Sequence, residues 1–216
     1  ATGGSVVTAL NEEAVVSAAL ANKGGLNLTV SYEAFAVKML GAIRQELIFT
    51  RHLAEAGRPP GGLSVPVVVT SHTWENGKNE QSHQDPTFCE ALLGEMSDFS
   101  RVLFPADWNS AIAALRATYN QRGQIWTLVV PKRPQPVAFT SAQSQALLDV
   151  GAVRVRGTGD AKESVLLAAI GAYQLAEALR ASDRLVAKGI AHTVVYMIEP
   201  GRFREPRDTR EAGHLT

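Results

Sequence analysis

Cysteine is nearly absent from this sequence, since Cys89 is the only one in 216 residues. One cysteine excludes an internal disulfide and a cysteine zinc cluster, so we expect a reducing cytoplasm and a small buried side chain. No apolar run approaches the roughly 18 to 20 residues that span a bilayer. The first residues show neither the basic start nor the apolar stretch of a secretory signal.

Net charge is also absent, because 21 Lys and Arg balance 21 Asp and Glu. This balance gives the chain no electrostatic attraction to nucleic acid or to an anionic membrane. Charged residues make up 19% and hydrophobic residues 45%, which predicts a folded chain with a sizeable core. Walker loops, glycine-rich dinucleotide loops and zinc motifs are missing as well.

Helical and strand patterns alternate along the chain. Asn11 is an expected helix cap before Glu12 and Glu13, and that helix ends before the Gly24-Gly25 pair. The alternation predicts an α/β three-layer sandwich with a mostly parallel sheet over 1–156. A linker and a partial βαβ domain are expected over 157–216. Further expected helices cover 32–56, 87–96, 109–120, 141–149 and 171–188, and expected strands cover 28–30, 65–70, 101–104, 124–130, 153–155, 164–170 and 192–198.

A polar segment, SHTWENGKNEQSHQDP from Ser71 to Pro86, follows the strand at 65–70. It leaves the carboxyl end of a strand, which is where parallel sheets carry their functional groups. Two of the five histidines lie in it, and histidine is the side chain best suited to move protons near neutral pH. Composition alone also allows a solvated surface loop, whereas long loops in compact domains are more often functional.

The order of residues in this segment resembles the phosphoketolase family. That family has a strand leading into an SHxW segment and then a loop ending in SHQDP. Other matches follow the family's order: SYEAF, a glutamate near the amino end, a proline–aspartate turn and a lysine-containing loop. The matching segments are 10–13, 31–35, 71–74, 82–86, 103–109 and 130–136. The segment 164–198 is similar to the opening of the family's C-terminal domain.

The resemblance implies a thiamine-diphosphate pyrimidine-binding domain followed by the start of a transketolase-like C-terminal domain. It implies cleavage of xylulose 5-phosphate or fructose 6-phosphate with inorganic phosphate, which yields acetyl phosphate and an aldose phosphate. The Gly-Asp-Gly motif of the family's Mg²⁺ site is missing from the chain. We therefore expect the metal ligands on a separate pyrophosphate-binding domain, a homodimer as the assembly, and no activity from this part alone.

The same resemblance assigns roles to individual residues. A carboxylate holds the aminopyrimidine ring nitrogen, an aromatic ring stacks on it, and a tyrosine beside it assists loss of water from the intermediate. An imidazole exchanges protons with sugar hydroxyls, two loop residues bind the sugar, and a lysine meets phosphate. These are, in order, Glu12, Phe35, Tyr32, His83, His72 with Asn79, and Lys132.

Each residue also has a simpler interpretation. Glu12 suits the positive end of a helix, Phe35 suits a core, and Lys132 suits a surface. The sequence departs from the family at Glu13 and Lys78, where the family has histidines, and at Thr87, where it has glycine. A diverged transketolase-like reaction on another keto-sugar phosphate therefore stays open. So does a non-catalytic dimerisation or regulatory role.

Overall fold

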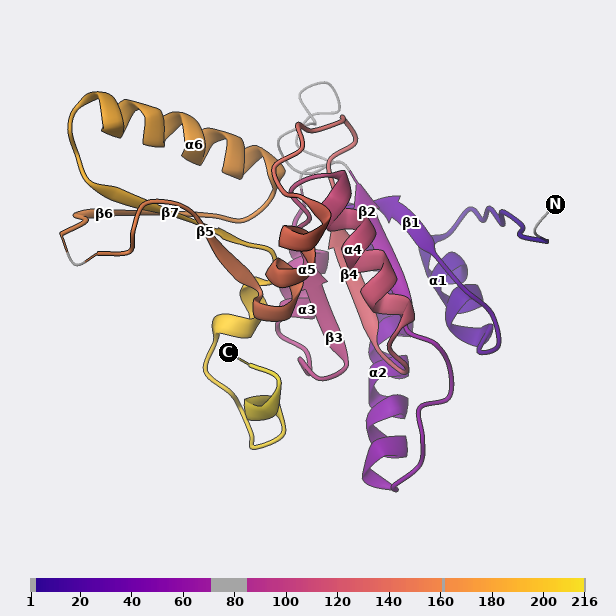
Figure 1. Ribbon diagram of the computed structural model, residues 1–216. Coiled ribbons are helices and arrows are strands. Elements are labelled where there is room, and N and C mark those ends of the chain that lie inside the picture. The colour runs from indigo at the N-terminus through magenta and orange to yellow at the C-terminus, as the bar shows by residue number, and fades with distance from the viewer. Residues whose placement is uncertain (1–2, 71–84, 161, 216) are drawn as a thin grey trace.

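The computed structural model describes residues 3–70, 85–160 and 162–215. Figure 1 shows a larger sheet in the centre, a smaller sheet with one long helix beside it, and the amino terminus extending away from both. None of the described helices is long and apolar enough to cross a membrane.

The larger sheet, sheet A, has four parallel strands in the order β1-β2-β4-β3. β1 spans Thr29–Tyr32, β2 Val65–Thr70, β3 Ser100–Leu103 and β4 Ile125–Val129. Both faces of β2 are largely buried, as a strand inside a parallel sheet requires. The predicted α/β class with a mostly parallel sheet is confirmed.

Pro66 sits in β2 without costing the sheet a hydrogen bond. The amide of Val65 donates to Gln124 O at 2.9 Å, on the side of β4. Because amides alternate sides along a strand, the nitrogen of Pro66 points toward β1, whose pairing begins only at Val67.

Helices cover both faces of sheet A. α1 (Glu12–Ala21), α2 (Leu40–Glu55) and α3 (Thr87–Leu93) bury apolar side chains against one face, together with Val67 and Val69. α4 (Trp108–Tyr119) and α5 (Ser141–Val150) pack on the opposite face, against Leu128 and Trp126. Cys89 is buried in the first of these cores, as the sequence predicted.

The helix predicted over 32–56 begins later than expected. Tyr32 is the last residue of β1, a 3₁₀ turn η1 (Ala36–Met39) follows, and α2 starts only at Leu40. Strand pairing of Tyr32 with Thr70 overrides the helical spacing of the apolar residues that follow. The site segment 32–35 is therefore a strand end and a turn.

The helix expected over 109–120 is not capped by Asn109 or Ser110, the residues at its expected start. Asp107, two and three residues earlier, is the N-cap and accepts from the Ser110 amide at 2.8 Å. The Ser110 hydroxyl lies 3.0 Å from the Asp107 amide, which completes a capping box.

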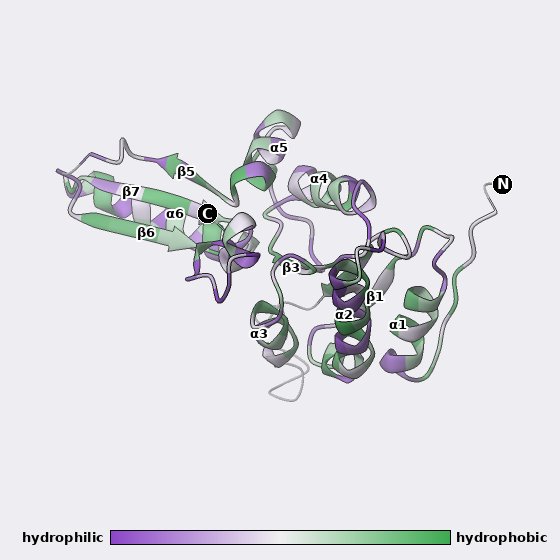
Figure 2. Ribbon diagram, turned by 90° about the horizontal axis from the view of Figure 1, so that it is seen from below, coloured by the Kyte–Doolittle hydropathy of each residue, from purple (hydrophilic) through white to green (hydrophobic). Residues whose placement is uncertain are grey.

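The smaller sheet contains the predicted βαβ unit. β6 (Val165–Ala169) and β7 (His192–Met197) are parallel, and α6 (Ala172–Ala187) connects them. The expected short strand at 153–155 is β5 (Ala152–Arg156), which pairs antiparallel with β7 in this sheet. β5 thus already belongs to the second sheet, while the domain division at residue 156 stays a prediction. Figure 2 shows β6 and β7 coloured mainly as hydrophobic.

The two sheets meet where β3 ends. The amide of Phe104 donates to Ile198 O at 2.8 Å, and the Tyr196 hydroxyl donates to Phe104 O. Tyr196 is fully buried and its ring centroid lies 5.6 Å from that of Phe139. Tyr196, from β7 of the smaller sheet, therefore packs into the core beside sheet A.

The polar tail from Glu199, which follows the last expected strand, is ordered by arginine contacts. It contains η4 (Pro200–Phe203) and η5 (Glu211–Gly213). The buried carboxylate of Glu211 accepts from the guanidinium groups of Arg204 and Arg207. Arg210 Nε lies 2.8 Å from Asp98 Oδ2, next to β3. The Glu211 pairs hold the tail together, and the Arg210–Asp98 pair joins it to the segment before β3.

Candidate active site

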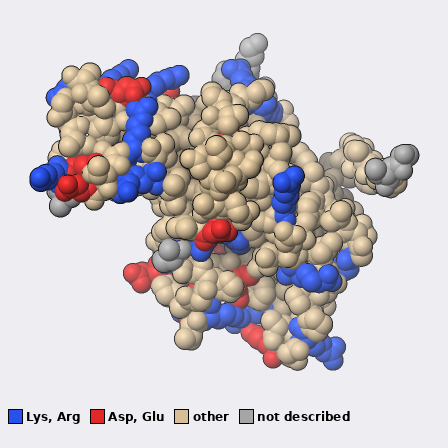
Figure 3. All heavy atoms as spheres, in the orientation of Figure 1, with Lys and Arg blue, Asp and Glu red and all other residues tan. Residues whose placement is uncertain are grey.

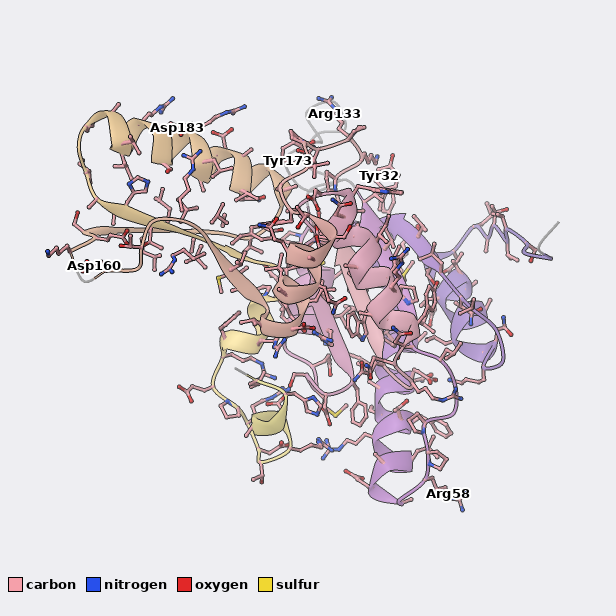
Figure 4. The ribbon with its side chains drawn as sticks, in the orientation of Figure 1. Tyr32, Arg58, Arg133, Asp160, Tyr173 and Asp183 are labelled. Atoms are coloured by element: carbon pink, nitrogen blue, oxygen red, sulfur yellow. The ribbon has the colours of Figure 1, made fainter. Side chains whose placement is uncertain are left out.

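The carboxyl ends of the parallel strands bring the candidate residues to one edge of sheet A. Tyr32 ends β1, Thr70 ends β2, and Lys132 follows β4 by three residues. The sheet bonds continue past these ends, because Glu33 N donates to Thr70 O at 2.9 Å and Val130 N to Val69 O at 3.0 Å. Figure 4 shows the labelled Tyr32 and Arg133 at this edge.

Two aromatic rings and a lysine gather here. The ring centroids of Tyr32 and Phe35 lie 6.0 Å apart with planes tilted by 55°. The ammonium nitrogen of Lys132 lies 3.5 Å from the Tyr32 ring centroid, a cation–π contact. Both rings are half-buried, so each keeps exposed surface that a ligand can contact.

Glu12 joins this group from α1. It is the first residue of the helix, where the helix dipole favours a negative charge, and Asn11 caps the helix by accepting from Glu13 N at 2.8 Å. Its Oε2 atom is buried and accepts no hydrogen bond from the described residues. Lys38 Nζ lies 3.4 Å from that oxygen and 5.5 Å from the Phe35 ring centroid.

A continuous row of contacts therefore links the predicted residues at the amino end with the lysine after β4. It runs from the Glu12 carboxylate through Lys38 to the Phe35 ring, then to Tyr32 and Lys132. A carboxylate near a half-buried aromatic ring suits a flat heteroaromatic ring that carries a protonated nitrogen. These side chains thus fit an aminopyrimidine.

The predicted loop residues His72, Asn79 and His83 lie outside the described residues. The described borders of that loop are Thr70, at the site edge, and Asp85, next to α3. Asp85 accepts from the Thr87 amide at 2.9 Å and from its hydroxyl, and these bonds lower the pKa of the Asp85 carboxyl.

A groove of about 490 Å³ opens beside Lys132 on the face that carries α4. Its floor is apolar, with Val68, Leu115 and Leu128 among the lining residues, and Lys132 and Arg133 also line it. Figure 3 shows few charged side chains over the centre of this face. In the part of the chain that the structure describes, no group of three or more metal-binding side chains lies together.

Asp107 and Asn109 stabilise the fold through hydrogen bonds to a neighbouring loop. Beyond capping α4, Asp107 accepts from the amides of Ala138 and Phe139, each at 2.8 Å. Asn109 donates to Phe139 O at 2.8 Å. The proline–aspartate turn therefore secures the loop that leads from Lys132 to α5.

Sequence reasoning missed Lys38. It lies three residues after Phe35, and its amide donates to Phe35 O at 3.2 Å in the first turn of η1. Residues three apart eclipse one another in a 3₁₀ turn, which places the lysine beside the ring. The spacing of three residues from Phe35 was the available signal, since such residues are neighbours on a regular helix as well. The sequence also did not single out Tyr173, at the start of α6. Figure 4 shows its label in the upper part of the view, as it does those of Tyr32 and Arg133.

Known proteins resemble this chain in sequence and in fold. A probable phosphoketolase of Bifidobacterium animalis is 28% identical over 156 residues, which cover 69% of this chain and 19% of that protein. One of Bradyrhizobium diazoefficiens is 30% identical over 161 residues, covering 71% and 20%. The chain thus spans about one fifth of the length of the curated relatives it matches.

Solved structures share the fold. A transketolase from Leishmania mexicana matches with a TM-score of 0.71 and 20% identity, covering 94% of this chain and 28% of that one. A split-gene transketolase, described as an inactive β4 tetramer, matches with a TM-score of 0.62 and 20% identity, covering 88% and 55%.

A family model carries the assignment further than these pairwise similarities. The model described as D-xylulose 5-phosphate/D-fructose 6-phosphate phosphoketolase matches residues 1–121, which is more than half of the chain. That range includes Glu12, Tyr32 and Phe35, the residues of the described row that come from α1, β1 and the turn after it. This chain belongs to the phosphoketolase family.

Proposed function

We propose that this chain supplies the pyrimidine side of a thiamine-diphosphate site in a phosphoketolase. The complete enzyme cleaves xylulose 5-phosphate or fructose 6-phosphate with inorganic phosphate and releases acetyl phosphate and a shorter aldose phosphate. The observation that carries this proposal is the row of contacts from Glu12 to Lys132 at the carboxyl edge of sheet A, in a chain of this family.

Each described residue has a role that its surroundings support. Glu12, whose Oε2 is buried without a hydrogen bond, holds the ring nitrogen of the aminopyrimidine. The half-buried Phe35 stacks on the ring, and the Tyr32 hydroxyl assists loss of water from the sugar-derived intermediate. Lys132 meets phosphate as a point charge. Thiamine diphosphate, when bound, would supply a nucleophilic carbon for the sugar carbonyl once the thiazolium ring has lost its C2 proton.

The loop residues complete the proposed site. His83 exchanges protons with sugar hydroxyls, and His72 and Asn79 hydrogen-bond the sugar. All three roles rest on the resemblance of the SHxW and SHQDP segments to the family.

The remaining parts of the site come from elsewhere in the assembly. We infer that a pyrophosphate-binding domain holds the diphosphate through Mg²⁺, and that two copies pair across the cofactor. The chain alone is then inactive and binds little thiamine diphosphate. The fold similarity to a split-gene transketolase described as an inactive tetramer supports this view. A calorimetric titration that found tight Mg²⁺-dependent binding to residues 1–216 alone would contradict it.

Product analysis tests the proposed reaction. The full gene product, supplemented with a separately encoded pyrophosphate-binding chain if it contains none, is incubated with xylulose 5-phosphate, phosphate, thiamine diphosphate and Mg²⁺. Acetyl phosphate is expected, and Glu12→Gln should abolish it. Ketol transfer to an added aldose without acetyl phosphate would instead establish the transketolase-like alternative, which the departures at Glu13 and Lys78 keep open.

A further inference from the structure

Lys38 links two residues of the proposed site that are far apart in the sequence. It lies in η1, with 58% of its side chain exposed, and contacts both the Glu12 carboxylate and the Phe35 ring. Its backbone position is fixed by the bond from its amide to Phe35 O. The ammonium group therefore lies between a carboxylate from α1 and a ring from the turn after β1.

We propose that Lys38 is a positioning residue that sets the Glu12 carboxylate beside the Phe35 ring before the aminopyrimidine binds. This inference rests on the proposed function of Glu12 and Phe35. None of the motifs that relate the chain to its family includes Lys38, because the SYEAF segment ends at Phe35.

The surroundings of one Glu12 oxygen carry the argument. Oε2 is buried, lies 3.4 Å from Lys38 Nζ and has no hydrogen bond to the described residues, while 21% of the Glu12 side chain stays exposed. Attraction to the ammonium group therefore favours one orientation of the carboxylate before a ligand arrives.

Stability is not the reason for this contact. Ion pairs between partly exposed side chains contribute little to folding, and the 3.4 Å separation lacks hydrogen-bond geometry. A carboxylate that is ordered in advance loses less conformational freedom when the ligand binds. The benefit of Lys38 should therefore appear in cofactor affinity.

Binding measurements test this role. In the complete enzyme, Lys38→Met should weaken thiamine-diphosphate affinity about 3- to 10-fold, the cost of ordering one side chain. Lys38→Arg, which keeps the charge, should stay within about twofold. The matched control is Lys23→Met, since Lys23 pairs with Glu46 far from the site edge and should leave the affinity unchanged.

A second readout tests the contact without cofactor. In residues 1–216 with ¹³C-labelled glutamate carboxyls, the Glu12 resonance, assigned by its loss in Glu12→Gln, should move in Lys38→Met and stay in Lys23→Met. An unmoved resonance, or an affinity equal to wild type in Lys38→Met, would overturn the positioning role alone. Absence of cofactor binding to the wild-type enzyme would overturn the proposed function and this inference with it.

Discussion

The ammonium nitrogen of Lys132 lies 3.5 Å from the centre of the Tyr32 ring. Tyr32 ends β1 and Lys132 follows β4, and β2 lies between these two strands. The lysine therefore reaches across a neighbouring strand to the half-buried tyrosine. A cation over a ring face is stabilised by the ring quadrupole. The proposed function assigns phosphate binding to this lysine.

Lys132→Met should raise the KM for the phosphorylated sugar about 10- to 100-fold with a much smaller change in kcat. One charge-assisted hydrogen bond is lost, and it acts on bound substrate and transition state alike. Steady-state kinetics of the complete enzyme measures both constants. Lys188→Met, at the exposed end of α6, is the control. A fall in kcat for Lys132→Met without a rise in KM would mean that Lys132 does not bind the phosphate group of the sugar.

Asn11 and Glu12 are neighbours whose replacement should have opposite effects. Asn11→Ala removes the acceptor for Glu13 N and should lower the free energy of unfolding by about 1 kcal/mol, with activity retained. Glu12→Gln should change stability by less than about 0.5 kcal/mol, because its ion pair is partly exposed, yet abolish turnover. Urea denaturation and product assays on both variants distinguish the two roles.

Features fixed within a few residues could be predicted from the sequence. The Asn11 cap and the strand Val65–Thr70 have the predicted limits, because a polar cap and a β-branched run are local signals. The meeting of strand ends at one edge of sheet A also followed from local patterns, since parallel strands place their carboxyl ends together.

Features that depend on distant partners could not be predicted. Lys38 meets Glu12 across 26 positions of sequence, and nothing near either residue signals the contact. β5 could not be assigned to the second sheet, because its partner β7 lies forty residues later. The helix expected from Tyr32 failed for the same reason, since pairing with Thr70 decides its conformation.

Asp107 should be the most costly polar side chain to replace in the proline–aspartate turn. One of its oxygens accepts from the Ser110 amide and the other from the amides of Ala138 and Phe139. Asp107→Ala leaves these buried donors unsatisfied and should lower the free energy of unfolding by about 2 to 4 kcal/mol.

Asn109→Ala offers the comparison within the same turn. It removes one bond, to Phe139 O, and should cost about 1 kcal/mol. Urea unfolding followed by far-ultraviolet circular dichroism measures both variants. Equal losses for the two would contradict the dominant role assigned to Asp107.

Acid should weaken the attachment of the tail through Glu211. Hydrogen bonds from Arg207, and then from Arg204, hold the pKa of this carboxyl well below its usual range, although burial acts in the opposite direction. A folded-state pKa below the unfolded value means that the unfolded chain binds the proton more tightly. The stabilisation is therefore complete above about pH 4.3, the unfolded value, and is lost as the pH falls below it.

Glu211→Gln isolates this contribution from those of other carboxyls. At about pH 7 the variant should unfold at lower urea concentration than wild type, because the amide cannot pair with two guanidinium groups. As the pH falls toward about 3, the wild-type midpoint should move toward that of the variant, since Glu211 in the unfolded wild-type chain then binds a proton, whereas the glutamine of the variant cannot. A gap that stays constant over this range would mean that the Glu211 charge does not stabilise the tail.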